Sequence, residues 1–232
     1  MYSEQALRIA ARLGWVQTLT APLQVAEQLV FAVQESLPVT GVGLGWVKDE
    51  IPGPLIAATD ERTRLLEDLQ FALGEGPCTR SVATGRPVLV DDLVRSGRAW
   101  PTYTAAAVAA GVAAAFVIPL RVGHVTIGVL DLYCDTPGPL PADALTEALA
   151  FGTVGSWVLL HLTTNPTAHL EDGEVPEQQA ERFHVHRAAQ LMAAELSLPV
   201  KAALNILRAR ARAEERPLAD LAQDVLAESA NQ

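Results

Sequence analysis

Four polar residues near the C-terminal end recur at helical spacing and offer the chemistry of anion binding. They are Lys201, Asn205, Arg208 and Arg212, separated by four, three and four residues. On an α-helix such residues lie along one line of the surface. Cationic side chains bind phosphate oxygens, and guanidinium groups also stack on unpaired bases. We interpret the stripe as an exposed phosphate-binding line, with an ordinary solvated helix face as the alternative.

A thiol and two aromatic residues form a second group of candidates. Cys78 follows Gly-Pro at an expected helix start, where the helix dipole lowers a thiol pKa and favours nucleophilic or redox chemistry. A buried structural cysteine is the alternative. Trp100 and Tyr103 offer apolar area with a polar handle. These three residues are predicted to line a ligand pocket, although the two aromatic residues equally fit a closed core.

Composition limits where anions are able to bind. The chain has 232 residues, of which 50% are apolar, and a formal net charge of −10. A nucleic-acid-binding surface over the whole chain is excluded, because phosphate contact needs clustered Lys and Arg. Residues 1–179 hold 10 Lys or Arg against 20 Asp or Glu, whereas residues 180–232 hold seven of each. Any such site is therefore expected in the C-terminal part.

Cysteine usage and hydropathy indicate the compartment. Cys78 and Cys134 are the only cysteines, and they lack the paired spacing of zinc sites or disulfide frameworks. The sequence therefore predicts no metal and no cofactor. The N-terminus lacks a basic segment followed by an apolar one, and no uninterrupted apolar run reaches the roughly 18 residues of a membrane span. We expect a cytoplasmic protein without a membrane segment.

Hydrophobic periodicity predicts the elements that must position these residues. Helices are expected over residues 22–37 and 140–162, and loop-to-helix segments over 74–80 and 105–111. Strands are expected over residues 39–47, 55–59, 86–92, 113–120 and 126–133. The last two form a hairpin around a short Gly turn. The fold class is therefore α+β, with an antiparallel sheet and flanking helices.

The C-terminal part is predicted to be separate and helical. Residues 164–178 contain prolines, a glycine and acids without periodicity, which indicates a linker. Helices are then expected over residues 181–196, 199–213 and 218–227. The predicted organisation is an N-terminal helical segment (1–19), a main domain (20–163), the linker (164–178) and a three-helix bundle (179–232).

Four segments of the main domain resemble the GAF family of actinobacterial sensor proteins: LQFALGEGPC (69–78), TGRPVLVDDL (84–93), PLRVG (119–123) and IGVLDLY (127–133). The resemblance implies a central antiparallel sheet and a pocket for a small-molecule or protein signal. The asparagine-lysine-phenylalanine-aspartate-glutamate signature of cyclic-nucleotide-binding members is missing. A GAF-fold methionine sulfoxide reductase uses thiols such as Cys78, which makes a thiol enzyme an alternative.

The C-terminal helices resemble the ANTAR family in VHRAAQLM (185–192), LSLPVKAAL (196–204), LR (207–208), Ala211 and RPLADLAQDV (216–225). The resemblance implies a homodimer that binds paired RNA hairpins in leader transcripts and disfavours a terminator. Arg208 is then the first candidate for an RNA contact, with Arg212, Lys201, Asn205 and Arg187 beside it. Gln190 and Ala189 depart from the family pattern, which has Gly and Lys there in many members.

These expectations combine into one functional prediction. The chain is predicted to be a non-enzymatic transcription antitermination regulator in which a GAF sensor controls an ANTAR module. Two alternatives remain open: the thiol enzyme, and a helix-turn-helix DNA reader. In the second, the helix over residues 218–227 would enter the groove, yet it carries only acids among its charged residues.

Overall fold

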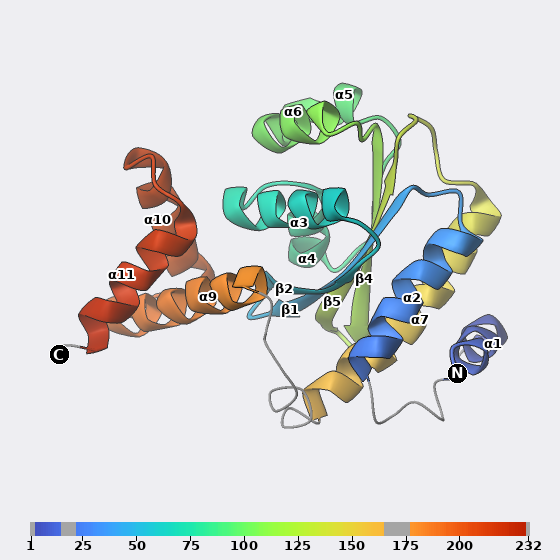
Figure 1. Cartoon of the computed structure of the whole chain (residues 1–232), viewed down its shortest axis with the longest axis horizontal. Coiled ribbons are helices and arrows are strands. Elements are labelled where there is room, and N and C mark those ends of the chain that lie inside the picture. Colours follow the sequence, from blue (N-terminus) through green and yellow to red (C-terminus); the bar gives the residue numbers. More distant parts are fainter. Residues whose placement is uncertain (1–2, 15–21, 165–176, 231–232) are drawn as a thin grey trace.

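A five-stranded antiparallel sheet forms the centre of the computed structural model, which describes residues 3–14, 22–164 and 177–230. The strands run in the order β2-β1-β5-β4-β3 (Figure 1). Their bounds are β1 Gly41–Lys48, β2 Ile51–Ala58, β3 Val88–Val90, β4 Ala114–Val122 and β5 Val125–Cys134. Each neighbouring pair is antiparallel, which confirms the predicted α+β class.

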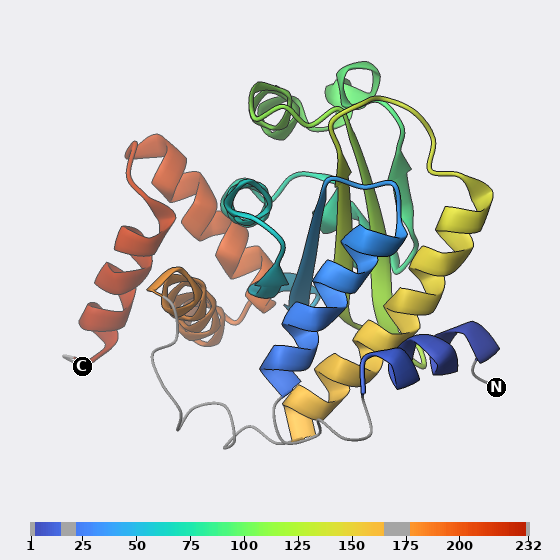
Figure 2. The same ribbon diagram turned by 45° about the vertical axis from the view of Figure 1, so that its right-hand side comes forward.

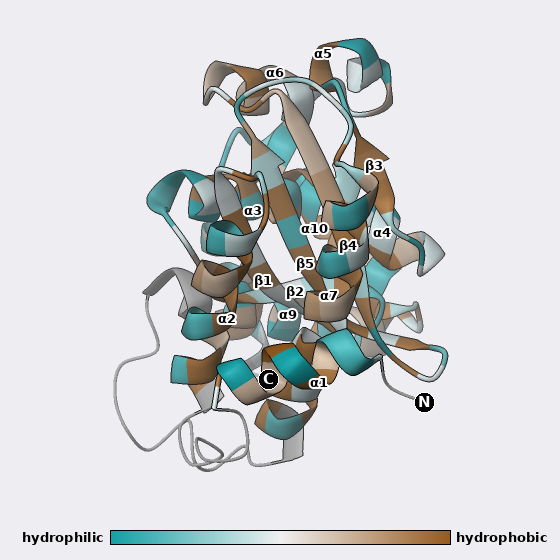
Figure 3. Cartoon of the chain, turned by 90° about the vertical axis from the view of Figure 1, so that its right-hand side faces the viewer, coloured by the Kyte–Doolittle hydropathy of each residue, from teal (hydrophilic) through white to brown (hydrophobic). Residues whose placement is uncertain are grey.

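Two long helices cover one face of the sheet. They are α2 (Pro22–Ser36) and α7 (Ala142–Thr164), and α1 (Glu4–Arg12) lies across α7 (Figure 2). Figure 3 views this side and shows the α1 ribbon alternating between teal and brown. Ala6, Ile9 and Ala10 of this helix are buried in the same core as α2 and α7. Residues 142–162 have the length and hydropathy of a membrane span, but α7 serves here as a core helix.

The opposite face carries shorter elements. These are α3 (Glu61–Leu73), α4 (Pro77–Thr84), α5 (Leu93–Ser96), the 3-10 turn η1 (Gly97–Ala99) and α6 (Pro101–Ala109). Tyr103 is fully buried, and Trp100 packs against the same cluster. Of the two interpretations of these aromatic residues, the core is therefore the one that the structure supports.

Helix α3 is absent from the elements predicted by hydrophobic periodicity, and the structure corrects that prediction. The helix begins at the N-cap Asp60, whose carboxylate accepts a hydrogen bond from the Thr63 amide, and ends at Gly74 in the left-handed conformation. Its sheet-facing residues are Thr63, Glu67 and Gln70, all of which are buried and polar. A helix that buries polar side chains gives no hydrophobic periodicity, so its signal is missing from the sequence.

Small residues on β1 let α3 lie close to the sheet. A Cβ atom at Gly41 would lie 2.5 Å from the Thr63 hydroxyl oxygen, and one at Gly43 would lie 3.5 Å from Glu67. The face of β1 that carries Gly41 and Gly43 is thus the face on which α3 packs. It fixes the position of Glu67 above the sheet.

The C-terminal helices pack beyond α3, on the side away from α2 and α7 (Figures 1 and 2). They are α9 (Glu177–Leu196), α10 (Val200–Ala213) and α11 (Leu218–Ala230), close to the expected bounds. Most of the predicted linker, residues 165–176, lies outside the described residues. The hydrophobic core of these helices includes Ile51 from β2 and Phe71 from α3. The module is therefore docked on the main domain rather than separate from it.

Candidate functional site

Arg208, in the middle of the predicted cationic stripe, is buried against the main domain, which corrects the expectation that the whole stripe is exposed; Arg212 at its end is exposed. Arg208 is only 7% exposed. Its Nε and Nη2 atoms donate to the carbonyl oxygen of Phe71 at 3.0 and 2.5 Å, and its Nη1 donates to Asn205 Oδ1 at 3.3 Å. Arg212 donates to the carbonyl oxygen of Leu73. Sequence periodicity placed these residues on one line correctly, but it gave no information on what covers that line.

The two arginines complete the C-terminal end of α3. The last four carbonyls of a helix have no partner within it, and this end carries a partial negative charge. Gly74 satisfies the Gln70 carbonyl, while Arg208 and Arg212 satisfy those of Phe71 and Leu73. The chemistry that would bind a phosphate is thus used to cap a helix of the other domain.

Arg182 on α9 is a third clasping arginine, and the sequence analysis missed it. It is 6% exposed, donates to Asp68 Oδ1 at 2.6 and 2.9 Å, and donates to the Gly53 carbonyl at 2.8 Å. Its guanidinium lies 5.1 Å from the centroid of the Phe71 ring, and that of Arg208 lies 5.6 Å from the same centroid. We call Arg182, Arg208 and Arg212, with their partners on α3, the arginine clasp.

Burial changes the acidity of the clasp. Desolvation, followed by the positive charge of Arg212, lowers the pKa of Arg208 to about 10. Arg208 therefore remains cationic at neutral pH, and its charge is offset by the Phe71 carbonyl and ring. Separating the module from α3 would hydrate the Arg208 guanidinium again.

The other predicted RNA-binding residues differ in exposure. Arg187 and Asn205 are exposed, and Lys201 is half-buried. Ala189 is fully buried in the core of the module, where a lysine would not fit. Gln190 donates to Asp49 on the β1–β2 turn at 3.4 Å, and His186 lies 3.2 Å from the same carboxylate. The Gln190 departure from the ANTAR pattern is thus a contact between the two parts.

The predicted pocket residues Cys78 and Tyr103 lie in a buried polar cluster on the other side of α3. Its hydrogen bonds join α3 to β5: Tyr133 donates to Glu67 at 2.5 Å, and Gln70 Nε2 donates to the Tyr133 hydroxyl at 3.1 Å. The Cys78 amide donates to Gln70 Oε1 at 2.8 Å. Asp131 of β5 is buried beside them. Trp100 lies farther out, half-buried.

Burial raises the pKa values of both acids in this cluster and of its thiol. Desolvation is the largest cause that raises the pKa values of Asp131 and Cys78 well above their usual range, and it raises that of Glu67 too. Cys78 packs among residues under α4, whereas Cys134 packs against the core under α2 and α7. The two thiols lie on opposite faces of the sheet, so they do not form a reactive pair.

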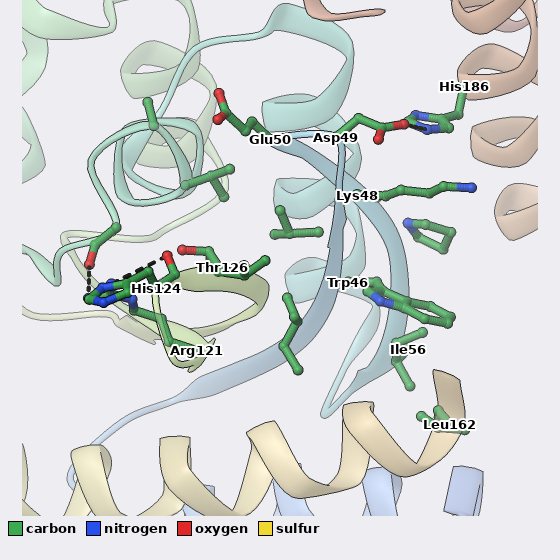
Figure 4. Close-up of a pocket in the computed structure, with 18 of the residues that line it drawn as sticks. Trp46, Lys48, Asp49, Glu50, Ile56, Arg121, His124, Thr126, Leu162 and His186 are labelled. Carbon is green, nitrogen blue, oxygen red and sulfur yellow. Dashed lines mark hydrogen bonds and ion pairs between the residues drawn. The ribbon is translucent and has the colours of Figure 1, made fainter. Parts of the chain in front are cut away.

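An open groove of about 1030 Å³ lies where the main domain meets α9 (Figure 4). The β1–β2 hairpin contributes Trp46 and Lys48, the β4–β5 turn contributes His124, and α9 contributes Phe183 and His186. The predicted pocket residues are absent from its lining. A molecule bound there would contact both the sheet and the docked module.

Comparison with known proteins identifies the main domain. The GAF domain family model matches residues 4–156, so the chain belongs to the GAF family. The match includes α1, which the predicted boundary at residue 20 had left outside. The predicted ANTAR assignment of the C-terminal helices has no matching family model. No curated protein matches.

Solved structures of low identity show the same fold. The GAF domain of a phosphoenolpyruvate-protein phosphotransferase from Coxiella burnetii aligns with a TM-score of 0.52 and 16% identity, over 71% of this chain and 99% of that one. The corresponding Acinetobacter domain aligns with a TM-score of 0.51 and 14% identity, over 75% of this chain and 99% of that one. A free methionine-R-sulfoxide reductase from Neisseria meningitidis aligns with a TM-score of 0.50 and 15% identity, over 71% of this chain and 95% of that one. The chain is therefore a GAF sensor domain followed by a docked three-helix module.

Proposed function

We propose that this protein is a cytoplasmic, GAF-regulated RNA-binding regulator of transcription antitermination. Its C-terminal helices would bind paired RNA hairpins as a homodimer, and the docked arrangement is the resting state. Two modules held together gain effective concentration, which compensates for a module whose formal charge is zero. The RNA target rests on the ANTAR resemblance of residues 181–228.

The arginine clasp is the observation that carries the proposal. Three guanidinium groups of the module are engaged by α3, and two of them belong to the stripe that the sequence singles out for phosphate binding. Phosphate and α3 compete for the same donors, so RNA binding requires release of the clasp. A signal that weakens docking therefore increases RNA affinity.

The groove beside α9 offers a way for a signal to act. Because Phe183 and His186 form one of its walls, a small molecule seated there binds the docked and undocked arrangements differently. Only such a difference in affinity shifts a conformational equilibrium. We propose the groove as the place where a small-molecule signal sets the fraction of released module.

The test is a titration of a transcript carrying two adjacent hairpins at fixed salt. Wild type is compared with Phe71→Ala, which weakens the clasp from the α3 side, and with the double variant Phe71→Ala/Arg208→Ala. We expect tighter binding by Phe71→Ala than by wild type, and loss of that gain in the double variant. Duplex DNA of equal length serves as competitor.

Two outcomes would contradict the proposal. Absence of binding by Phe71→Ala rules out an RNA-binding output, and equal competition by duplex DNA favours the DNA-reading alternative. Equal affinities of the single and double variants would remove Arg208 from the RNA contact. Phe31→Ala is the matched control, because Phe31 lies on α2 and is 48% exposed.

A further inference from the structure

The buried polar cluster gathers three side chains of the kind that hold metal ions. Glu67 comes from α3, Cys78 from the first turn of α4 and Asp131 from β5. Each offers one ligand atom, and these atoms all lie within 4.8 Å of one another. Their exposed fractions are 4%, 1% and 1%. The three residues are distant in sequence, so cysteine spacing gave no indication of the cluster.

The Asp131 carboxyl group lacks a hydrogen-bond partner at either oxygen among the described residues. The nearby cation, Arg182, donates instead to Asp68 and Gly53. A buried ionised group without a partner is costly, and such groups are usually paired or bind metals.

A second buried polar group points into the same place. The Tyr103 hydroxyl is fully buried and has no hydrogen-bond partner within the described part of the chain. Tyr103 packs in the same cluster as Tyr133, whose hydroxyl donates to Glu67. Burial and the negative charge of Glu67 raise the pKa of Tyr103, and the neighbouring Tyr133 hydroxyl acts in the opposite direction. Two independent unpartnered groups thus border the same buried space.

We propose that Glu67, Cys78 and Asp131 bind a divalent transition-metal ion of the zinc class. One thiolate and two carboxylates suit a borderline-soft ion, whereas magnesium and calcium take oxygen ligands. The ligand atoms lie close enough together for one ion to bind all three. Three protein ligands leave a fourth position for water or for the neighbouring phenol.

Binding is coupled to proton release. Burial raises the pKa values of the thiol and of both carboxyl groups, which favours their protonated forms. The ion binds the deprotonated groups, and their protons leave to solvent. No oxidant or reductant is needed. Metal affinity is therefore expected to rise with pH.

The site lies on the same helix as the arginine clasp. Glu67 faces the cluster, and Phe71, one turn later, faces the module. An ion that fixes α3 against β5 thus acts on the helix that holds the module. Metal binding itself does not depend on the proposed RNA function, because its ligands all belong to the GAF domain.

The test uses the full chain with Cys134→Ser as the parent, so that Cys78 is the only thiol. The metal-free protein is titrated with Co²⁺ and Zn²⁺, and bound metal is counted by mass spectrometry. We expect one ion per chain, a thiolate-to-cobalt charge-transfer band, and a Zn²⁺-dependent rise in melting temperature. Cys78→Ser should lose the band, and Asp131→Asn should weaken binding at least tenfold.

The controls distinguish a specific metal site from nonspecific metal binding. Asp91→Asn removes an exposed carboxylate and should leave binding unchanged. Circular dichroism identifies variants that fail to fold, and the isosteric Asp131→Asn keeps the proposal testable if Cys78→Ser is one of them. Sub-stoichiometric binding by the parent, or equal binding by Asp131→Asn, would overturn the proposal.

Discussion

Replacing Phe71 with alanine should release the C-terminal module without unfolding the GAF domain. The Phe71 side chain is 5% exposed and belongs to the hydrophobic core of α9–α11, not to the core beneath α2 and α7. Its ring also contacts the guanidinium groups of Arg182 and Arg208. The substitution therefore removes apolar contact and two cation–π contacts from the docking interface alone.

The expected magnitude follows from these contacts. A buried Phe→Ala change costs about 3–5 kcal/mol in a protein core. The module's end of the interface is able to relax, so we take the lower limit, about 3 kcal/mol. Since about 1.4 kcal/mol is a factor of ten, the ratio of released to docked molecules should rise about a hundredfold.

Hydrogen–deuterium exchange measures this shift directly. In Phe71→Ala we expect faster exchange over residues 49–55, over 68–76 and in α9 and α10, with β4, β5 and α7 unchanged. Phe31→Ala should match wild type throughout. Unchanged exchange at residues 68–76 would show that Phe71 does not hold the module. Faster exchange that extended into β4 and β5 would show that it stabilises the GAF core, and either result would refute the reasoning.

Three further predictions concern single residues. In the presence of chelator, Asp131→Asn should stabilise the fold at neutral pH. Because the pKa of Asp131 is raised in the folded state, wild type loses stability as pH rises above the unfolded pKa of about 3.9. The melting temperatures of the two proteins should therefore converge near pH 4, and a difference that grows on acidification would contradict this. Gly74→Ala should lower the free energy of unfolding by about 1 kcal/mol or more in denaturant titrations, since Gly74 has a φ of 67° and an added Cβ would lie 2.7 Å from Arg208 Nη1. It should also speed hydrogen exchange in the module. Wild-type behaviour in both measurements would argue against the clasp geometry. A maleimide should label one thiol per native chain, because Cys134 is half-buried and Cys78 is 1% exposed; rapid labelling of both would show that the cluster opens.

Much of the sheet followed from the sequence because its strands are apolar runs that are buried along most of their length. The hairpin of β4 and β5 and the helix α7 lie within a few residues of their predicted bounds, since apolar periodicity over many residues specifies both type and extent. The three C-terminal helices were located by the same signal, and the second and third also by Pro199 and Pro217 at their starts. Their family assignment depends on resemblance and stays a prediction.

Helix α3 shows why the candidate sites were harder to find. Its two functional faces carry Glu67 and Gln70 on one side, and Asp68 and Phe71 on the other. A helix with polar residues on its buried face has the same hydropathy pattern as an exposed helix or a loop. Arg182 was missed for a related reason, because nothing in its local pattern distinguishes a buried clasp residue from a solvated one.

The sequence by itself determined the α+β class, the sensor family, the helical C-terminal part and the line of cations along α10. Those properties depend on local periodicity and short motifs. Only the tertiary structure decided that Arg208 faces α3 instead of solvent, and that Glu67, Cys78 and Asp131 meet beneath it. Both are long-range contacts, and the burial that gives these polar groups their altered pKa values exists only once the chain has folded.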